Sequence, residues 1–232
     1  MEFFIDGKKV RYNSYNNKYL GKGLEVVAYK IDDKAVKFFK KSPGKEIFLT
    51  KESIEKMKKI KTKRILLPTD ALLDKKHNLR GYQMDYVEDL GSDSYFDLDK
   101  DKLNEEHELL RNDIEVLSDN KITLADLTSK NTVYHNGLYL IDPGSYKFDS
   151  TVDENQAYGI NIDWVNLYLL YVVIRNYHLA KYSGSKNFID RDFSRKINIE
   201  YNKSGKNDVL EFLSDIEEDN LGEFVERRVN KH

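Results

Sequence analysis

Three polar residues in the middle of the chain could together bind a metal ion. Asp126 and Asn131 stand in one predicted loop, and Asp142 follows at the end of a short predicted hairpin. Carboxylate and amide oxygens are preferred ligands of Mg²⁺, and the phosphates of a nucleotide commonly complete its coordination. Alternatively, Asp126 and Asn131 cap turns and Asp142 begins an ordinary β-turn. The residue types therefore predict either a site for magnesium and a nucleotide or two plain turns.

A lysine and two glycines upstream could supply the rest of a phosphate site. Lys37 lies within an apolar run, where an ammonium group needs an anionic partner unless it reaches solvent. Gly21 and Gly23 precede it between two predicted strands and could form a loop over phosphates, although a glycine turn in a hairpin has the same sequence. Cations, metal ligands and an orienting carboxylate are the groups that phosphoryl transfer requires.

The elements that would position these residues fall into two groups along the chain. Strands are expected over the first third, with Asp6-Gly7 as a hairpin turn and a helix over about residues 45–61. Helices are expected at 103–117 and from Asp163 onward, with a loop at 122–131 and a hairpin around Asn136-Gly137 between them. Strands first and helices second predict an α+β fold of two lobes, 1–88 and 89–232, which together form one domain.

The order and spacing of these motifs resemble those of the protein-kinase-like superfamily, in particular small bacterial Ser/Thr-kinase-like proteins. The segment from Asp126 to Asn131 has the D-L-x-x-x-N form of the catalytic loop. Asp142-Pro143-Gly144 is similar to the metal-binding D-F-G segment, with proline in place of phenylalanine. The resemblance covers about residues 18–174. It implies an antiparallel sheet lobe with one helix, a mainly helical lobe, and ATP with Mg²⁺ between them.

The resemblance implies a role for each polar residue. Asp126 would orient the attacking hydroxyl, and Lys37 would contact the α- and β-phosphates. Asp142 and Asn131 would hold Mg²⁺. A glutamate from the first helix would pair with Lys37, and counting along the chain favours Glu52, with Glu55 as the alternative.

The remaining nucleotide contacts are also implied by the resemblance. Gly21 and Gly23 would cover the phosphates, although Val26 stands where the family has a third glycine. Met84 would lie behind the adenine, and the backbone of Asp85 and Val87 would bond to it.

The segment Asn161-Ile162-Asp163-Trp164 resembles the D-x-W start of the central helix in the large kinase lobe. This implies that Asp163 ties down the catalytic loop by accepting hydrogen bonds from backbone N–H groups. The alternative is an acidic residue that meets the dipole at a helix N-terminus.

The sequence departs from the family in ways that leave the substrate open. Leu124-Ala125 replaces the His-Arg pair before the catalytic aspartate, and no A-P-E segment follows Gly144. The expected activity is transfer of the γ-phosphate to a protein Ser/Thr hydroxyl. The alternatives are a small-molecule phosphotransferase and a catalytically silent pseudokinase that acts as a binding module.

The bulk composition narrows the partners and the location. Net charge is -2, from 38 basic and 40 acidic residues, so neither nucleic acid nor a membrane surface is an expected partner. There are no cysteines, which excludes disulfides and thiolate metal sites. The apolar run at 167–174 is too short to span a bilayer, and the first residues do not resemble a signal peptide. A cytoplasmic protein is expected, with a nucleotide and a phosphoacceptor as partners.

Overall fold

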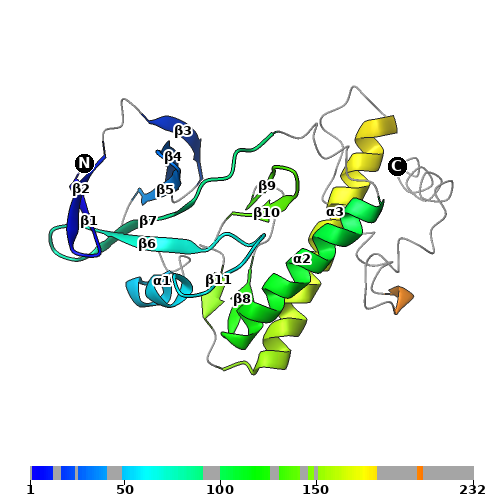
Figure 1. The fold of residues 1–232 in the computed structure, drawn as a ribbon. Helices are drawn as coiled ribbons and strands as arrows, with labels where there is room; N and C mark the ends of the chain where they lie inside the picture. Colours follow the sequence, from blue (N-terminus) through cyan, green and yellow to red (C-terminus); the bar gives the residue numbers. More distant parts are fainter. Residues whose placement is uncertain are drawn as a thin grey trace.

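The computed structural model describes residues 2–12, 17–23, 26–40, 49–90, 100–125, 131–141, 146–148, 151–181 and 203–205. Within these residues the fold is α+β, with a seven-stranded antiparallel sheet, two small two-stranded sheets and three α-helices. The large sheet lies at one end of the molecule and the two long helices at the other (Figure 1). The prediction of an α+β fold is confirmed.

The large sheet is built from the first 85 residues of the chain. Its strands are β1 (Glu2–Ile5), β2 (Lys8–Arg11), β3 (Lys18–Lys22), β4 (Val26–Ile31), β5 (Lys34–Phe39), β6 (Pro68–Leu73) and β7 (Leu79–Asp85). Their order across the sheet is β2-β1-β6-β7-β5-β4-β3. Asp6 and Gly7 both have positive φ and join β1 to β2, as the sequence predicted. The N-terminal hairpin therefore extends the sheet beyond β6.

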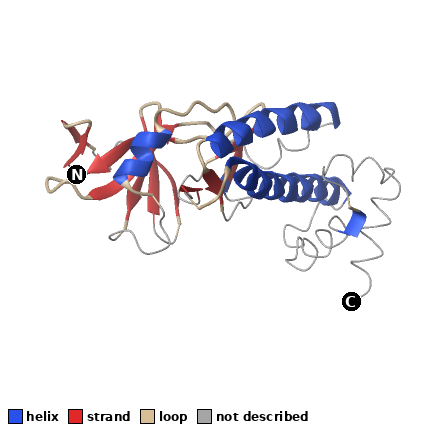
Figure 2. Ribbon diagram, turned by 90° about the horizontal axis from the view of Figure 1, so that it is seen from below, coloured by secondary structure: helices blue, strands red, loops and turns tan. Residues whose placement is uncertain are grey.

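The helix α1 (Lys51–Met57) covers one face of this sheet (Figure 2). It begins later and ends earlier than the predicted range of 45–61. Thr50 is extended and caps the helix, because its hydroxyl accepts from Ser53 N–H while the Ser53 hydroxyl accepts from Thr50 N–H. Ile54 and Met57 point into the core, so the predicted apolar stripe is correct although the helix boundaries were not.

The second half of the described chain holds two long helices and four short strands. These are α2 (Lys100–Asp119), β8 (Ile122–Leu124), β9 (Thr132–Tyr134), β10 (Leu138–Leu140), β11 (Tyr146–Phe148) and α3 (Glu154–Lys181). The hairpin of β9 and β10 around Asn136-Gly137 is confirmed. The loop predicted from residue 122 is wrong at its start, because β8 pairs with β11. A three-residue strand is too short to produce a visible alternation of apolar residues.

The helices α2 and α3 lie side by side (Figures 1 and 2). α3 begins at Glu154 rather than at Asp163. The cap is Asp153, whose carboxylate accepts from Gln156 N–H at 2.8 Å while its own N–H donates to the Gln156 side chain at 3.0 Å. In the described part of the chain, no helix is long and apolar enough to cross a membrane.

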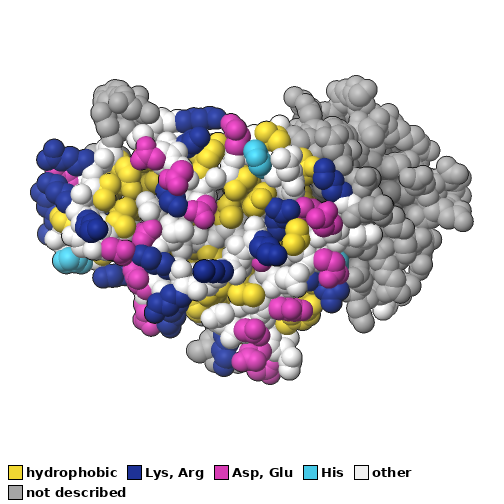
Figure 3. Space-filling model, in the orientation of Figure 1, with side chains coloured by type: hydrophobic (Ala, Val, Ile, Leu, Met, Phe, Trp, Pro, Cys, Tyr) yellow, Lys and Arg dark blue, Asp and Glu magenta, His cyan; other side chains and the backbone are white. Residues whose placement is uncertain are grey.

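Two apolar clusters stabilise this arrangement. The larger one runs from α1 and one face of the sheet to α2, α3 and the short strands, and includes Ile54, Tyr82, Leu110, Ile114, Leu138 and Val165. The smaller one lies among Phe3, Tyr12, Val36, Phe38 and Leu72. On the outer surface, basic side chains gather near the β1–β2 hairpin and alternate with acidic ones elsewhere on the face shown in Figure 3.

Candidate functional site

Lys37 connects the large sheet to the loops that follow the short strands. It lies in β5, its side chain is only 8% exposed, and its ammonium donates to the carbonyl oxygen of Ile141 at 2.9 Å. Its ammonium also lies 5.6 Å from the ring centroid of Tyr82 on the neighbouring strand β7. Ile141 immediately precedes Asp142 in the sequence. The structure therefore brings Lys37 to the start of the segment that carries the predicted metal ligand.

Asn131 joins the same group through the backbone. Its carbonyl oxygen accepts a hydrogen bond from Ile141 N–H at 2.8 Å. Lys37 and Asn131 are therefore both bonded to the backbone of Ile141, Lys37 to its carbonyl oxygen and Asn131 to its N–H group. Asp126 and Asp142 lie outside the described residues, and the structure describes the chain up to Ala125 and Ile141, the residues just before them.

The segment that leads to Asp126 is anchored by a buried amide. Asn161 of α3 is 0% exposed, and its side-chain oxygen accepts from Leu124 N–H at 2.7 Å. Its amide group donates to the carbonyl of Ile122 at 2.8 Å and to the Ser118 hydroxyl at 3.1 Å. One side chain thus satisfies both a backbone donor and a backbone acceptor of β8, whose last residue is two positions before Asp126. Because buried polar groups of this kind are fully paired, the strand has one well-defined position.

The anchoring role was predicted for Asp163, and that prediction is wrong. Asp163 is exposed on α3, in the middle of the helix rather than at its start. Asn161 lies two residues earlier, on the buried face. An amide fits this position better than a carboxylate because it can donate as well as accept, and the Ile122 carbonyl requires a donor.

Glu52 is not the partner of Lys37 in this structure. Its side chain is 79% exposed and pairs with Lys56 one helical turn away, at 3.1 Å. The reason is the cap at Thr50, which fixes Ser53, Ile54 and Met57 as the buried face of α1 and leaves Glu52 toward solvent. The alternative, Glu55, is half-buried and forms no ion pair with Lys37.

The predicted adenine-contacting strand is β7 and the residues after it. Met84 is buried in the larger core cluster, between Ala35 of β5 and Pro68 of β6 in the sheet. Asp85 ends β7, and its exposed carboxylate accepts from the Lys34 ammonium at 2.6 Å, an interaction that raises the pKa of Lys34. Val87 is half-buried in the extended segment that follows.

That extended segment is tied to the β9–β10 hairpin. Leu90 N–H donates to the carbonyl of Tyr134 at 3.0 Å, and a His135 ring nitrogen lies 3.0 Å from the carbonyl oxygen of Glu88. The chain therefore leaves the large sheet at a fixed position beside the strands that lead to Ile141.

Gly21 and Gly23 lie at the end of β3, at the edge of the sheet. An added Cβ on Gly21 would meet no atom within 4 Å, and one on Gly23 would meet only the Val26 side chain at 3.6 Å. Neither glycine has a positive φ. Packing within the described chain therefore does not explain these glycines, and they leave open space next to the backbone.

Gly81 is a different case, and sequence reasoning missed its importance. A Cβ at Gly81 would lie 2.1 Å from the carbonyl oxygen of Lys37, because β5 and β7 approach closely at this point. The absence of a side chain at position 81 therefore allows β5 to lie this close to β7, and Lys37 to occupy its position in β5. A glycine inside an apolar strand is the sequence signal for such a close approach.

We expect Gly81→Ala to destabilise the protein by about 3 kcal/mol, since the clash is with backbone that cannot move cheaply. The control is Gly21→Ala, for which we expect a change within about 1 kcal/mol. Urea denaturation of both variants measures the difference. Equal stability of the two variants would contradict the close approach of β5 and β7.

Two buried carboxylates on α2 also support the site, and the sequence did not single them out. Asp113 accepts hydrogen bonds from the N–H groups of Lys63, Arg64 and Ile65. Glu106 accepts from an Arg64 guanidinium nitrogen at 2.7 Å and from Leu138 N–H at 2.9 Å. Both lie among the apolar positions of the predicted helical stripe, and an acidic residue on such a face is the signal that could have identified them.

Comparisons with known proteins do not identify the chain: no protein-family model matches it, and no curated protein matches its sequence. Within the described residues, no group of three His, Cys, Asp or Glu side chains is placed to hold a metal ion. The ligands predicted for Mg²⁺ are Asp142 and Asn131, of which only Asn131 belongs to the described part of the chain.

Proposed function

We propose that this chain is an ATP- and Mg²⁺-dependent phosphotransferase of the protein-kinase-like fold that acts on a protein Ser/Thr hydroxyl. The observation that carries the proposal is the hydrogen bond from the buried Lys37 ammonium to the carbonyl of Ile141. A buried cation is expensive unless negative charge or strong dipoles surround it. Lys37 is held at Ile141, one position before Asp142 in the sequence, which is consistent with a cation that contacts phosphates beside a metal ligand.

The arrangement of the elements supports the proposed two-lobed fold. A large antiparallel sheet with α1 on one face comes first, and the helices α2 and α3 follow after the extended segment 86–90. The polar residues belong to the strands and loops at the junction. Asn131 and Ile141 come from the ends of the short strands, and Lys37 comes from the large sheet.

Each residue has a defined part in the proposed reaction. Lys37 would place positive charge on the phosphates, and Asp142 with Asn131 would hold the metal ion. When bound there, the metal ion would supply further positive charge at the phosphates. Asp126 would orient the acceptor hydroxyl, in a loop whose entry is fixed by Asn161 and whose exit is fixed by the bond between Asn131 and Ile141.

A thermal-shift titration with ATP, with and without Mg²⁺, tests the proposal. At a hundredfold excess over the dissociation constant, binding adds about 2.7 kcal/mol to the apparent stability. For a chain of this length that corresponds to a rise in Tm of about 5–10 °C. We expect the rise to be largest with both components present and to be greatly reduced in Lys37→Ala.

The matched control is Lys9→Ala, which removes an exposed strand lysine paired with Glu2 at the far edge of the sheet. This variant should keep the full rise in Tm. No rise in the wild-type protein at millimolar Mg²⁺ and ATP, or an equal rise in Lys37→Ala, would refute nucleotide binding at this site.

A further inference from the structure

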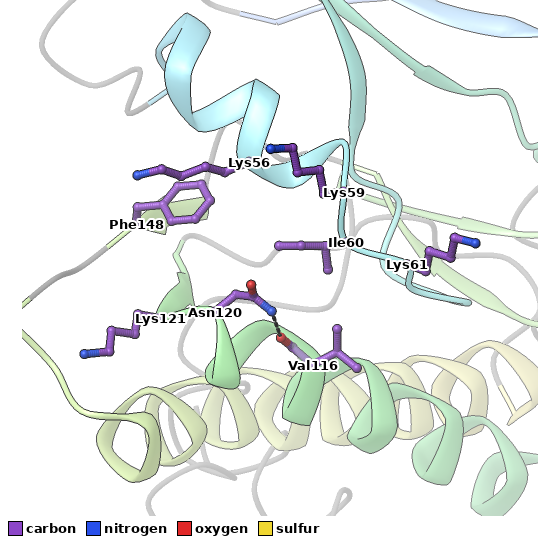
Figure 4. Close-up of a pocket in the computed structure, with 8 residues that line it drawn as sticks. All are labelled: Lys56, Lys59, Ile60, Lys61, Val116, Asn120, Lys121 and Phe148. Carbon is purple, nitrogen blue, oxygen red and sulfur yellow. Dashed lines mark hydrogen bonds between the residues drawn. The ribbon is translucent and has the colours of Figure 1, made fainter.

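A cavity whose lining does not include Lys37 lies between the helices and a short strand. It has a volume of about 700 Å³ and is formed where the C-terminal ends of α1 and α2 meet β11 (Figure 4). Ile60, Val116 and Phe148 provide its apolar surface, with Ile60 between the other two in Figure 4. The side-chain amide of Asn120 donates to the Val116 carbonyl at 2.8 Å and is thereby fixed at the end of α2. The cavity therefore has a defined apolar floor.

Basic side chains surround this floor. Among the described residues that line it, four are lysines and none is acidic: Lys56, Lys59, Lys61 and Lys121. They come from α1, from the segment after it and from the end of α2. In Figure 4 they extend outward in different directions rather than toward one point. The ammonium of Lys56 lies 5.6 Å from the ring centroid of Phe148, so charge and apolar surface adjoin one another.

The positive charge of this rim is only partly balanced. Lys56 pairs with Glu52, whereas Lys59, Lys61 and Lys121 form no ion pair with any residue in the described ranges. Lys58, between them in sequence, is on another side of α1 and contacts two carboxylates, Asp6 and Asp70, both at 2.7 Å. The lysines around the cavity thus leave a local excess of positive charge beside an exposed apolar floor.

We propose that this cavity docks an acidic peptide segment of a partner protein, in which apolar side chains alternate with carboxylates. An apolar side chain would cover Ile60, Val116 and Phe148, and carboxylates along the segment would lie near lysines on different sides. Complementary charge of this kind steers association and fixes register. A compact phosphate group would fit less well, because it would leave the floor uncovered and could not reach lysines that point apart. The described part of the lining also has no arginine, the residue most used for bidentate phosphate recognition.

The test is fluorescence anisotropy with the full-length protein and a labelled synthetic dodecapeptide in which glutamate alternates with leucine or phenylalanine. Two control peptides separate the contributions: one has glutamine for each glutamate, and the other has serine for each apolar residue. We expect the first peptide to bind with an affinity that falls with added salt, and both controls to bind much more weakly.

Variants locate the binding. Lys56→Gln with Lys59→Gln should weaken binding about tenfold, as expected for the loss of two exposed charge pairs. The control pair Lys8→Gln with Lys76→Gln, two exposed lysines elsewhere on the surface, should leave it unchanged. Val116→Asp places a charge on the floor and should abolish binding, and its circular dichroism and Tm show whether it remains folded. The double lysine variants change only surface residues and should fold normally. They therefore test the proposal even if Val116→Asp does not fold.

Three results would overturn the proposal. The first is equal binding of the serine-substituted acidic peptide, or full competition by tripolyphosphate or a single-stranded oligonucleotide, which would indicate a general anion site. The second is a lysine double variant at the cavity that behaves like its control. The third is carbodiimide cross-linking, within monomers, of Lys56 or Lys59 to carboxylates at 208–224, which would identify this chain's own acidic segment as the occupant.

Discussion

Replacement of Asp126 by asparagine should slow phosphoryl transfer by a factor of about 100 to 10,000 while Mg²⁺-ATP binding stays close to that of the wild type. Asparagine has the size of aspartate but cannot accept a proton from the acceptor hydroxyl. Binding should persist because Lys37, Asn131 and Asp142 are unchanged. Initial rates of γ-phosphate transfer to a generic protein substrate, together with the thermal shift by nucleotide, measure the two properties separately.

The structure explains why the effect should be confined to transfer. The strand before Asp126 is held by the Asn161 amide, and the end of its loop is held by the bond between the Asn131 carbonyl and Ile141 N–H. A change of one side chain between these anchors leaves both in place. The matched control is Asp163→Asn, an exposed aspartate on α3, which should transfer at the wild-type rate.

The same assay ranks the alternative functions. Transfer to small hydroxyl compounds but not to proteins would favour a small-molecule phosphotransferase. Wild-type protein that binds Mg²⁺-ATP and transfers to no acceptor would favour a pseudokinase. If Asp126→Asn transferred as fast as the wild type, the residue would have no part in the reaction and the assigned mechanism would be wrong.

Local sequence patterns predicted the parts of the fold that depend on neighbouring residues. The Asp6-Gly7 turn and the Asn136-Gly137 hairpin follow from residues that tolerate positive φ. The apolar stripe with Ile54 and Met57 identified the buried face of α1. In each case the deciding interaction lies within a few positions along the chain.

Features that depend on distant contacts were missed. The strand β8 exists because it pairs with β11 and is bonded by Asn161, and neither partner is near it in sequence. The choice of Glu52 failed because it was made by counting back from the end of the helix, although the stripe of Ile54 and Met57 already places Glu52 on the solvent side of α1. The choice of Asp163 over Asn161 followed a motif, whereas the position needs a side chain that both donates and accepts.

Asp113→Ala should destabilise the protein by about 3–5 kcal/mol, because it removes the acceptor of several buried backbone N–H groups at once. The carboxylate of Asp113 is buried and accepts from Lys63, Arg64 and Ile65 N–H at distances between 2.6 and 3.0 Å. Removing it leaves backbone donors without an acceptor, at about 1–3 kcal/mol for each buried group.

The loss should also reach the candidate site through the backbone. Leu66 N–H donates to the Leu140 carbonyl and Leu140 N–H donates to the Arg64 carbonyl, both at 2.8 Å. Leu140 ends β10 and precedes Ile141, whose carbonyl accepts from Lys37. A loosened segment at 63–66 would therefore release the strand that places Ile141.

Urea denaturation and nucleotide thermal shift together test both consequences of Asp113→Ala. We expect Asp113→Ala to have a lower urea midpoint than the wild type. We also expect Mg²⁺-ATP to raise the Tm of the variant by less than it raises the Tm of the wild type. Glu115→Ala is the control, since this exposed glutamate lies two residues away on the same helix and should change stability by no more than about 0.5 kcal/mol. Asp113→Asn should restore only part of the stability, because its one remaining oxygen can accept from the backbone but its NH₂ group would face N–H donors.

An Asp113→Ala variant as stable as Glu115→Ala would show that α2 does not hold the 63–65 segment. A destabilised variant with an unchanged rise in Tm would show that this segment does not position Ile141.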